Sequence, residues 1–135
     1  MHIEDLLSKV RSEALLTQSE KETRKIFESG KNYIFDFFQP LIQESEENLD
    51  LNPDLFKVDV REDWITIYFQ HNFIRFFLKP CEIYVEHIMS PFDRLQIQNG
   101  KLISNRFQKE LSEELLELYL DRLFMDLEKD FILNQ

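Results

Sequence analysis

The sequence between residues 56 and 87 reads FKVDVREDWITIYFQHNFIRFFLKPCEIYVEH. It holds four short runs in which apolar and polar residues alternate, at residues 56–60, 64–70, 73–79 and 83–87. Alternation with a period of two is typical of strands with one buried face, and short polar breaks between such runs are typical of hairpin turns. The stretch therefore predicts an antiparallel meander.

The polar breaks make the meander testable, because two-residue turns fix which residues of neighbouring strands lie opposite each other. Turns at residues 62–63, 71–72 and 80–81 predict these pairs: Val60 with Ile65, Val58 with Ile67, Phe69 with Ile74, Ile67 with Phe76, Leu78 with Ile83, Phe76 with Val85, and Ile74 with His87. One face of the sheet is then apolar. On the other face Arg75 lies opposite Glu86, a pair of opposite charges that adds roughly 0.2 to 1 kcal/mol. Lys79 lies opposite Glu82 in the same way, so two patterns agree on one register.

Two helical segments precede the meander. Residues 3–16 carry apolar side chains at helical spacing and predict an amphipathic helix. Ser19 with Glu22 fits a capping box, so either a second helix begins there or one helix runs through. The next segment has a wide apolar stripe, in which Gly30 predicts close packing or a bend. Pro40 predicts a kink or a break just before it.

A second hairpin follows the meander. Residues 89–93 connect to a pair of strands joined by Asn-Gly at residues 99–100. Asn-Gly is the strongest short signal for a type I′ turn, whose two central residues need positive φ. We therefore expect Ile97 to lie opposite Leu102 on the core side.

The last apolar stripe predicts a helix that is capped by Ser104 or Asn105 and runs to about Ile132. The predicted fold class is thus α+β, with N-terminal helices, a five- or six-stranded antiparallel meander sheet, and a long C-terminal helix packed on the sheet. A chain of 135 residues is long enough for one core. We predict a single domain over residues 1–135, with residues 1–18 as a candidate for a separate or mobile N-terminal helix.

Charge is unevenly distributed along the chain, which has a net charge of −10. Residues 1–55 hold 6 Lys/Arg and 12 Asp/Glu, residues 56–104 hold 6 and 6, and residues 105–135 hold 4 and 8. The predicted sheet is therefore neutral, and its helical flanks are acidic. Such a chain repels phosphate backbones and attracts basic proteins, which argues against a general nucleic-acid binder.

Residues with catalytic potential are scarce. Neither His71, in a predicted turn, nor His87, at a strand end, has a sequence neighbour that completes a catalytic dyad. Cys81 is the single cysteine, and no zinc spacing, phosphate loop or nucleophile elbow occurs. We expect no catalytic residue, metal or cofactor, and the sequence leans away from an enzyme. With no signal peptide and no membrane-spanning run, we expect a cytoplasmic protein without a membrane partner.

The polar face of the predicted sheet is the first candidate surface. It combines aromatic and basic side chains, as protein interfaces do. The candidate partner-binding residues are Arg61, Trp64, Tyr68, Arg75, Phe77 and Tyr84. Either a helix covers this face, or a second copy forms a homodimer through it, or a foreign protein binds it. Single-strand nucleic-acid binding is disfavoured by the acidic flanks.

The acidic segments at residues 43–54 and 110–130 are the second candidate surface. Their candidate partner-binding residues are Glu44, Glu46, Glu47, Glu113, Glu117 and Asp121. The format of a small acidic α+β protein without site chemistry is similar to that of bacterial immunity proteins and other stoichiometric inhibitors, although no motif carries the similarity. The leading hypothesis is a non-enzymatic module that binds a basic protein partner. The alternatives are a ligand-binding or enzymatic domain with a pocket between helix and sheet, and an acidic DNA mimic.

Overall fold

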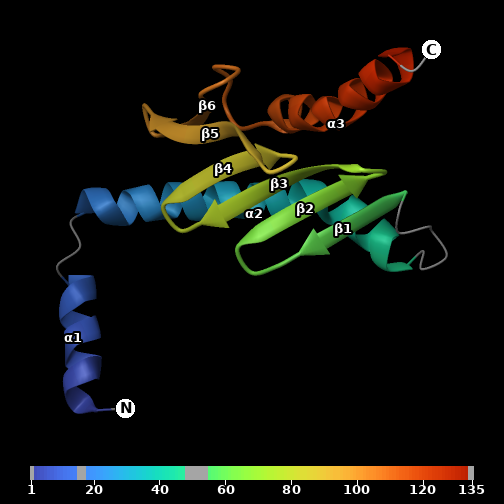
Figure 1. The fold of residues 1–135 in the computed structure, drawn as a ribbon. Coiled ribbons are helices and arrows are strands. Elements are labelled where there is room, and N and C mark those ends of the chain that lie inside the picture. The colour runs from blue at the N-terminus through green and yellow to red at the C-terminus, as the bar shows by residue number, and fades with distance from the viewer. Residues whose placement is uncertain (1, 15–17, 48–54, 134–135) are drawn as a thin grey trace.

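The computed structural model describes residues 2–14, 18–47 and 55–133. In chain order the elements are α1 (Ile3–Ala14), α2 (Gln18–Glu47), β1 (Phe56–Val60), β2 (Trp64–Phe69), β3 (Asn72–Lys79), β4 (Glu82–His87), β5 (Ser90–Gln98), β6 (Lys101–Ser104) and α3 (Glu113–Leu133). The strands form one antiparallel sheet in sequential order from β1 to β6, shown in Figure 1. The predicted α+β fold is confirmed.

Three of the four predicted hairpin registers are confirmed. Val58 pairs with Ile67 across β1 and β2. Phe76 pairs with Val85 across β3 and β4, in the register that also places Arg75 opposite Glu86 and Lys79 opposite Glu82. Across β5 and β6 the Ile97–Leu102 pair forms around an Asn-Gly turn whose two residues have φ of 53° and 76°.

The turn between β2 and β3 lies one residue earlier than predicted. Phe69 pairs with Asn72 and Ile67 with Ile74, so the predicted pairs Phe69–Ile74 and Ile67–Phe76 are wrong. Gln70 takes the left-handed position in the turn, with φ of 55°. Asn72 belongs to the strand because its side chain is buried, and its Nδ2 donates a hydrogen bond of 2.9 Å to the Leu123 carbonyl of α3. The register moves by two residues, so every side chain keeps its predicted face.

Two boundaries after the meander also differ from prediction. β5 already begins at Ser90, because Ile88 and Met89 form a tight turn with φ of 49° and 65°. α3 begins at Glu113, where the Leu115 N–H donates to Ser112 Oγ at 3.3 Å. The predicted cap at Ser104 or Asn105 is therefore wrong.

Ser104 is instead the last residue of β6. Its side chain is buried, donates to Asp93 Oδ2, and accepts a hydrogen bond of 3.0 Å from the Phe107 N–H. The chain then turns back, since Ile103 forms a bridge with Glu110. A serine hydroxyl used in the interior by a distant carboxylate looks the same in the sequence as one that caps a helix.

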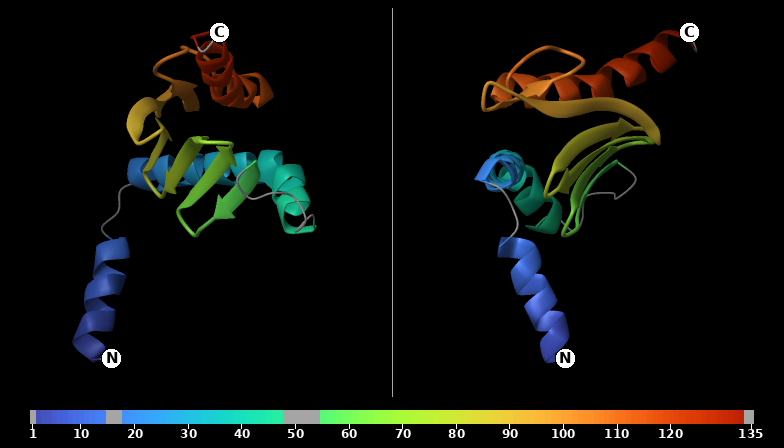
Figure 2. Two further views of the ribbon diagram at one scale, coloured as in Figure 1. Left: turned by 45° about the vertical axis from the view of Figure 1, so that its right-hand side comes forward. Right: turned by 90° about the vertical axis from the view of Figure 1, so that its left-hand side faces the viewer.

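α2 runs through Pro40 to Glu47, so the predicted break does not occur. The predicted kink is visible in Figure 2, where the last turns of α2 bend away from the preceding ones. Pro40 is exposed, and so is Asp36, the residue whose carbonyl loses its helical partner. Gly30 is a site of close packing, as expected: a Cβ there would overlap Leu102 and lie 3.2 Å from Ile83 Cδ1.

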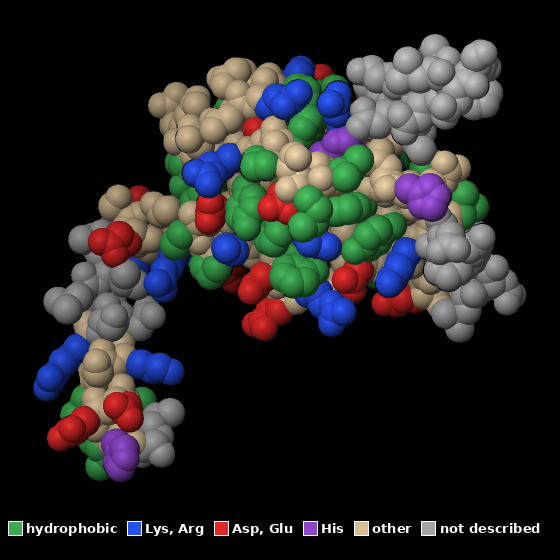
Figure 3. Space-filling view, viewed as in Figure 1, with side chains coloured by type: hydrophobic (Ala, Val, Ile, Leu, Met, Phe, Trp, Pro, Cys, Tyr) green, Lys and Arg blue, Asp and Glu red, His purple; other side chains and the backbone are tan. Residues whose placement is uncertain are grey.

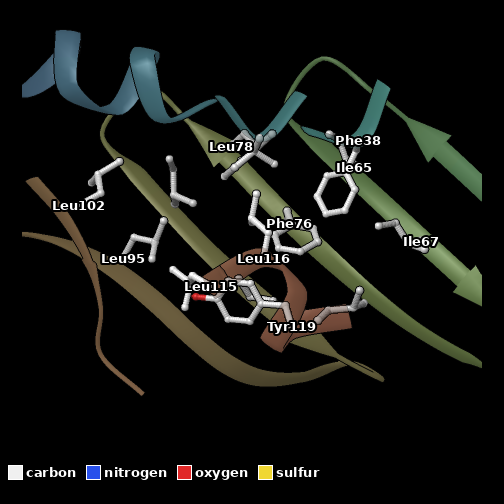
Figure 4. Packing of buried hydrophobic residues seen from close by; sticks show 14 of the residues in the cluster. Phe38, Ile65, Ile67, Phe76, Leu78, Leu95, Leu102, Leu115, Leu116 and Tyr119 are labelled. Atoms are coloured by element: carbon white, nitrogen blue, oxygen red, sulfur yellow. The ribbon is translucent and has the colours of Figure 1, made fainter. Parts of the chain in front are cut away.

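α2 and α3 pack on the same face of the sheet. Phe38 of α2 and Tyr119 of α3 both contact Phe76 of β3, with ring centroids 5.2 and 5.6 Å apart. Figure 4 shows these side chains converging with those of the strands in one core. None of the described helices is long and apolar enough to cross a membrane.

α1 stands apart from this core. Figure 1 draws it away from the sheet, and its apolar side chains are exposed over 45% to 76% of their surface: Ile3, Leu6, Leu7 and Val10. Residues 15–17, where the sequence left open whether one helix or two would form, lie outside the described residues.

Candidate interaction surface

The face of the sheet opposite α2 and α3 is not covered by any described helix (Figure 2). Along β3 the side chains alternate between buried and half-buried, which is the pattern of a strand with one face in the core and the other at the surface. Figure 3 shows apolar side chains gathered over the middle of this face, interspersed with basic and acidic ones. We call it the open face. Of the arrangements that the sequence left open, coverage by a helix of the same chain is not observed among the described residues.

Aromatic rings form the centre of the open face. Phe77 of β3 stacks on Tyr84 of β4 with ring centroids 4.4 Å apart and planes 11° from parallel. Trp64 of β2 meets Phe77 edge-on at 5.9 Å. Tyr68 and Phe73 lie 5.5 Å apart on the same two strands, β2 and β3, nearer to the turn that joins them. Because the rings hold one another in place, little side-chain freedom remains to be lost when another surface covers them.

Arg75 lies among these rings. Its Nε donates to Thr66 Oγ1 at 2.8 Å, and its Nη2 to Tyr68 Oη at 3.4 Å. Its guanidinium carbon lies 5.4 Å from the Trp64 ring centroid, within cation–π range. The two hydrogen bonds engage two of the five guanidinium N–H groups.

Trp64 has an indole N–H that is buried under neighbouring side chains. No acceptor reaches this Nε1 among the residues that the structure describes. A buried donor without an acceptor is costly, typically about 1 to 3 kcal/mol. Thus the Trp64 side chain is held by ring contacts rather than by a hydrogen bond of its own.

Charged side chains of both signs surround the rings, and the β1–β2 turn adds the acidic Glu62 and Asp63. On β1 to β5 and the residue that follows β1, the open face carries five basic and three acidic side chains: Lys57, Arg61, Arg75, Lys79 and Arg94, with Asp59, Glu82 and Glu86. Glu82 pairs with Arg94 at 2.7 Å, although Lys79 lies opposite it in register. Arg61 pairs with Asp59 at 3.3 Å. The net charge of −10 therefore does not arise on this face, where the two signs nearly balance.

A groove of about 620 Å³ adjoins the aromatic patch at its β5 side. Tyr84 and Glu86 form one wall, and the segment after β6 supplies Arg106 to the other. The guanidinium carbon of Arg106 lies 4.3 Å from the ring centroid of Phe92, a further residue of the groove. The groove and the rings form one continuous surface because Tyr84 belongs to both.

Asp93 anchors the floor of this groove. Its Oδ1 accepts hydrogen bonds from the backbone N–H groups of Arg94 at 2.7 Å and Arg106 at 2.9 Å. Its Oδ2 accepts from Ser104 Oγ and, at 2.5 Å, from Tyr119 Oη. Asp93 was not among the sequence-predicted residues, and its four donors come from three separate segments that only the fold brings together.

Burial raises the pKa of the Tyr119 hydroxyl well above its ordinary value of about 10, and Asp93 raises it further through the hydrogen bond and through its charge. The native state therefore keeps the proton at a pH where the unfolded chain releases it.

Stability should consequently depend on this proton in alkaline solution. The stabilisation that a raised native pKa provides is complete below about pH 10. It is lost as pH rises above that value, at up to about 1.4 kcal/mol per pH unit. We expect the free energy of unfolding, measured in urea between pH 9 and 11, to fall about 1 kcal/mol more for the wild-type chain than for Tyr119→Phe. If the free energies of unfolding of the two chains fell in parallel with pH, the raised pKa of Tyr119 would be contradicted.

The acidic residues predicted from sequence are exposed and lie on two helices. Glu44, Glu46 and Glu47 belong to the last turns of α2. Glu113, Glu117 and Asp121 lie along α3. The rest of the predicted acidic segment, residues 48–54, lies outside the described residues. The structure does not bring the two groups together into one cluster with the open face.

The histidines and the cysteine have ordinary structural surroundings. His87 is half-buried, with Nε2 2.7 Å from Asn72 Oδ1. His71 lies exposed in the β2–β3 turn, and Cys81 is exposed in the β3–β4 turn. Within the described part of the chain, no three His, Cys, Asp or Glu side chains gather in a way that could hold a metal ion.

Comparison of the chain with protein-family models, with curated proteins and with solved structures found no match.

Proposed function

We propose that this protein is a non-enzymatic protein-binding module that docks its partner on the open face. The observation that carries the proposal is a sheet face free of any described helix, with stacked aromatic rings around a central arginine. Aromatic and arginine side chains dominate the binding energy of protein interfaces. Large apolar patches on the surface of a monomer are otherwise uncommon.

The chemistry of the face specifies the part of the partner that it contacts. Phe77 and Tyr84 offer a flat apolar platform, which fits an aliphatic or aromatic side chain. Arg75 offers guanidinium N–H groups beside it, which fit a carboxylate. A segment with an apolar centre and acidic neighbours matches both features.

The overall charge acts over a longer range. With a net charge of −10 concentrated on the helices, the chain attracts a partner that is basic as a whole and increases its rate of association. This combination is the basis for proposing a cytoplasmic, stoichiometric inhibitor of the immunity type. Charge governs the encounter, and the open face supplies the contact.

The docking surface can be tested with two matched variants of the full chain, each immobilised and exposed to a lysate of the native host. Phe77→Glu places a charge in the middle of the open face. Tyr33→Glu places the same charge on a partly exposed aromatic residue of α2. Captured proteins are identified by mass spectrometry, and their affinities are then measured with purified components by calorimetry.

The expected result is a partner that binds the wild-type chain and Tyr33→Glu alike, and binds Phe77→Glu at least about 30-fold more weakly, corresponding to a hot-spot loss of about 2 kcal/mol. Equal binding by all three chains would exclude the open face. The helical charge is tested separately with the triple change Glu113→Gln, Glu117→Gln and Asp121→Asn, which should slow association at low salt and leave dissociation unchanged.

A further inference from the structure

α1 presents a second unpartnered apolar surface on the same chain. Its stripe of Ile3, Leu6, Leu7 and Val10 is exposed. A helix of 12 residues is marginal in water without a surface to pack on. An amphipathic helix of this length therefore needs an apolar partner to account for its pattern.

The open face matches α1 in shape and charge. A helix lies along a sheet face so that its apolar stripe covers neighbouring strands, and the rings of Trp64, Phe77 and Tyr84 supply an apolar platform there. The first turn of α1 carries Glu4 and Asp5 and its last turn carries Arg11. The acidic first turn can meet Arg75 and Lys79, which lie among the rings of the open face. Docking would bury apolar side chains on both sides and bring opposite charges together.

The length of the connection decides which copy is covered. Ala14 and Gln18 are separated by four Cα steps, which span at most about 14 Å. α2 packs on the opposite face of the sheet, and helices on the two faces of one sheet have axes roughly 20 Å apart, given their diameter and the intervening layer. The connection therefore disfavours docking of α1 flat on the open face of its own chain.

We infer that α1 of one copy docks on the open face of a second copy, and that the exchange is reciprocal in a two-fold dimer. The inference rests on the proposed docking surface, because the second copy occupies the face that a foreign partner would use. Dimerisation and partner capture then compete. In the dimer, α1 of the second copy occupies the position on the open face that the acidic, apolar segment of a foreign partner would take.

The test uses the full chain and two variants of α1 that carry the same new charge. Val10→Asp places it in the apolar stripe, and Ser8→Asp places it on the polar side of the same helix. Mass is followed by sedimentation from 1 to 200 µM, a range set on the order of typical weak homodimer affinities. Trp64 is the single tryptophan of the chain and lies on the open face, so its emission reports coverage directly.

We expect the wild-type chain and Ser8→Asp to dimerise with a blue shift of the Trp64 emission, and Val10→Asp to remain monomeric with unshifted emission. Phe77→Glu, which damages the face and leaves α1 intact, should also remain monomeric. A mixture of Val10→Asp and Phe77→Glu supplies one intact helix and one intact face. It should form a heterodimer, because one of the two exchanged contacts is restored.

Three outcomes overturn the inference: a wild-type chain that stays monomeric with unshifted emission, a dimer that Val10→Asp does not weaken, and a monomer whose blue-shifted emission is lost in Val10→Asp. The second result would indicate a dimer of two open faces, and the third a helix docked on its own chain. The proposed function fails separately, through equal capture of the partner by the wild-type chain and Phe77→Glu. Circular dichroism of each variant establishes that it is folded.

Discussion

Replacing Phe76 with alanine is expected to lower the free energy of unfolding by about 3 to 5 kcal/mol, the usual cost of removing a fully buried phenylalanine. Phe76 is completely buried between Phe38 of α2 and Tyr119 of α3. No single neighbour can fill the space that the ring leaves. The loss therefore includes both the transfer of apolar surface and the cavity.

The adjacent Phe77 provides the matched control, because it is the same residue type on the same strand with its side chain on the open face. Phe77→Ala should cost no more than about 1.5 kcal/mol, since its ring is only half-buried and loses mainly the contacts with Tyr84 and Trp64. Urea unfolding of both variants at a concentration where the chain is monomeric measures the difference. Equal losses would mean that the open face is covered within one chain.

The second large effect is expected at Asp93, where alanine should lower the free energy of unfolding by about 3 kcal/mol or more. The change leaves four donors without their acceptor. Two of them, the hydroxyls of Tyr119 and Ser104, belong to fully buried residues and cannot turn to water. Asp59→Ala is the matched control, because among the described residues that carboxylate pairs with Arg61 near the surface, an interaction worth about 0 to 1 kcal/mol.

A double variant separates the anchoring role of Asp93 from general damage. In an Asp93→Ala background, Tyr119→Phe removes one of the orphaned hydroxyls and should restore part of the loss. The two single costs would then not add, as expected for groups in direct contact. Strict additivity in urea unfolding would show that the Tyr119–Asp93 hydrogen bond contributes nothing. Loosening of the segment around Arg106 in Asp93→Ala should also appear as faster amide exchange there.

The strand pairing was largely predictable because alternation and two-residue turns are local properties of the sequence. The β3–β4 register, including Arg75 opposite Glu86, follows from the alternation on both strands and the short break between them. The turn before β3 was misplaced because the decisive contact of Asn72 is with Leu123, 51 residues away. The start of α3 was misplaced for a similar reason, since Ser104 is used by Asp93.

The residues of the candidate site also divide into those that the sequence could place and those that it could not. Trp64, Tyr68, Arg75, Phe77 and Tyr84 could be placed together from the sequence because strand registers bring them onto one face. Arg106 and Asp93 could not, since the segment after β6 was expected to be helical, and its return toward β5 depends on hydrogen bonds to Asp93. No local pattern in the sequence marks that return.

The sequence by itself determined the strands, the apolar side of the sheet, and the excess of acidic residues in the helical segments. Whether the aromatic face is covered was decided by the tertiary structure. α2 and α3 are each amphipathic, and a helical stripe specifies that it will be buried but not against which face. Both helices pack on the predominantly apolar face, where they bury the most apolar surface and where the polar side chains that α3 meets, Asn72 and Asp93, are hydrogen-bonded to it. That choice leaves Arg75 and its surrounding rings open to a partner.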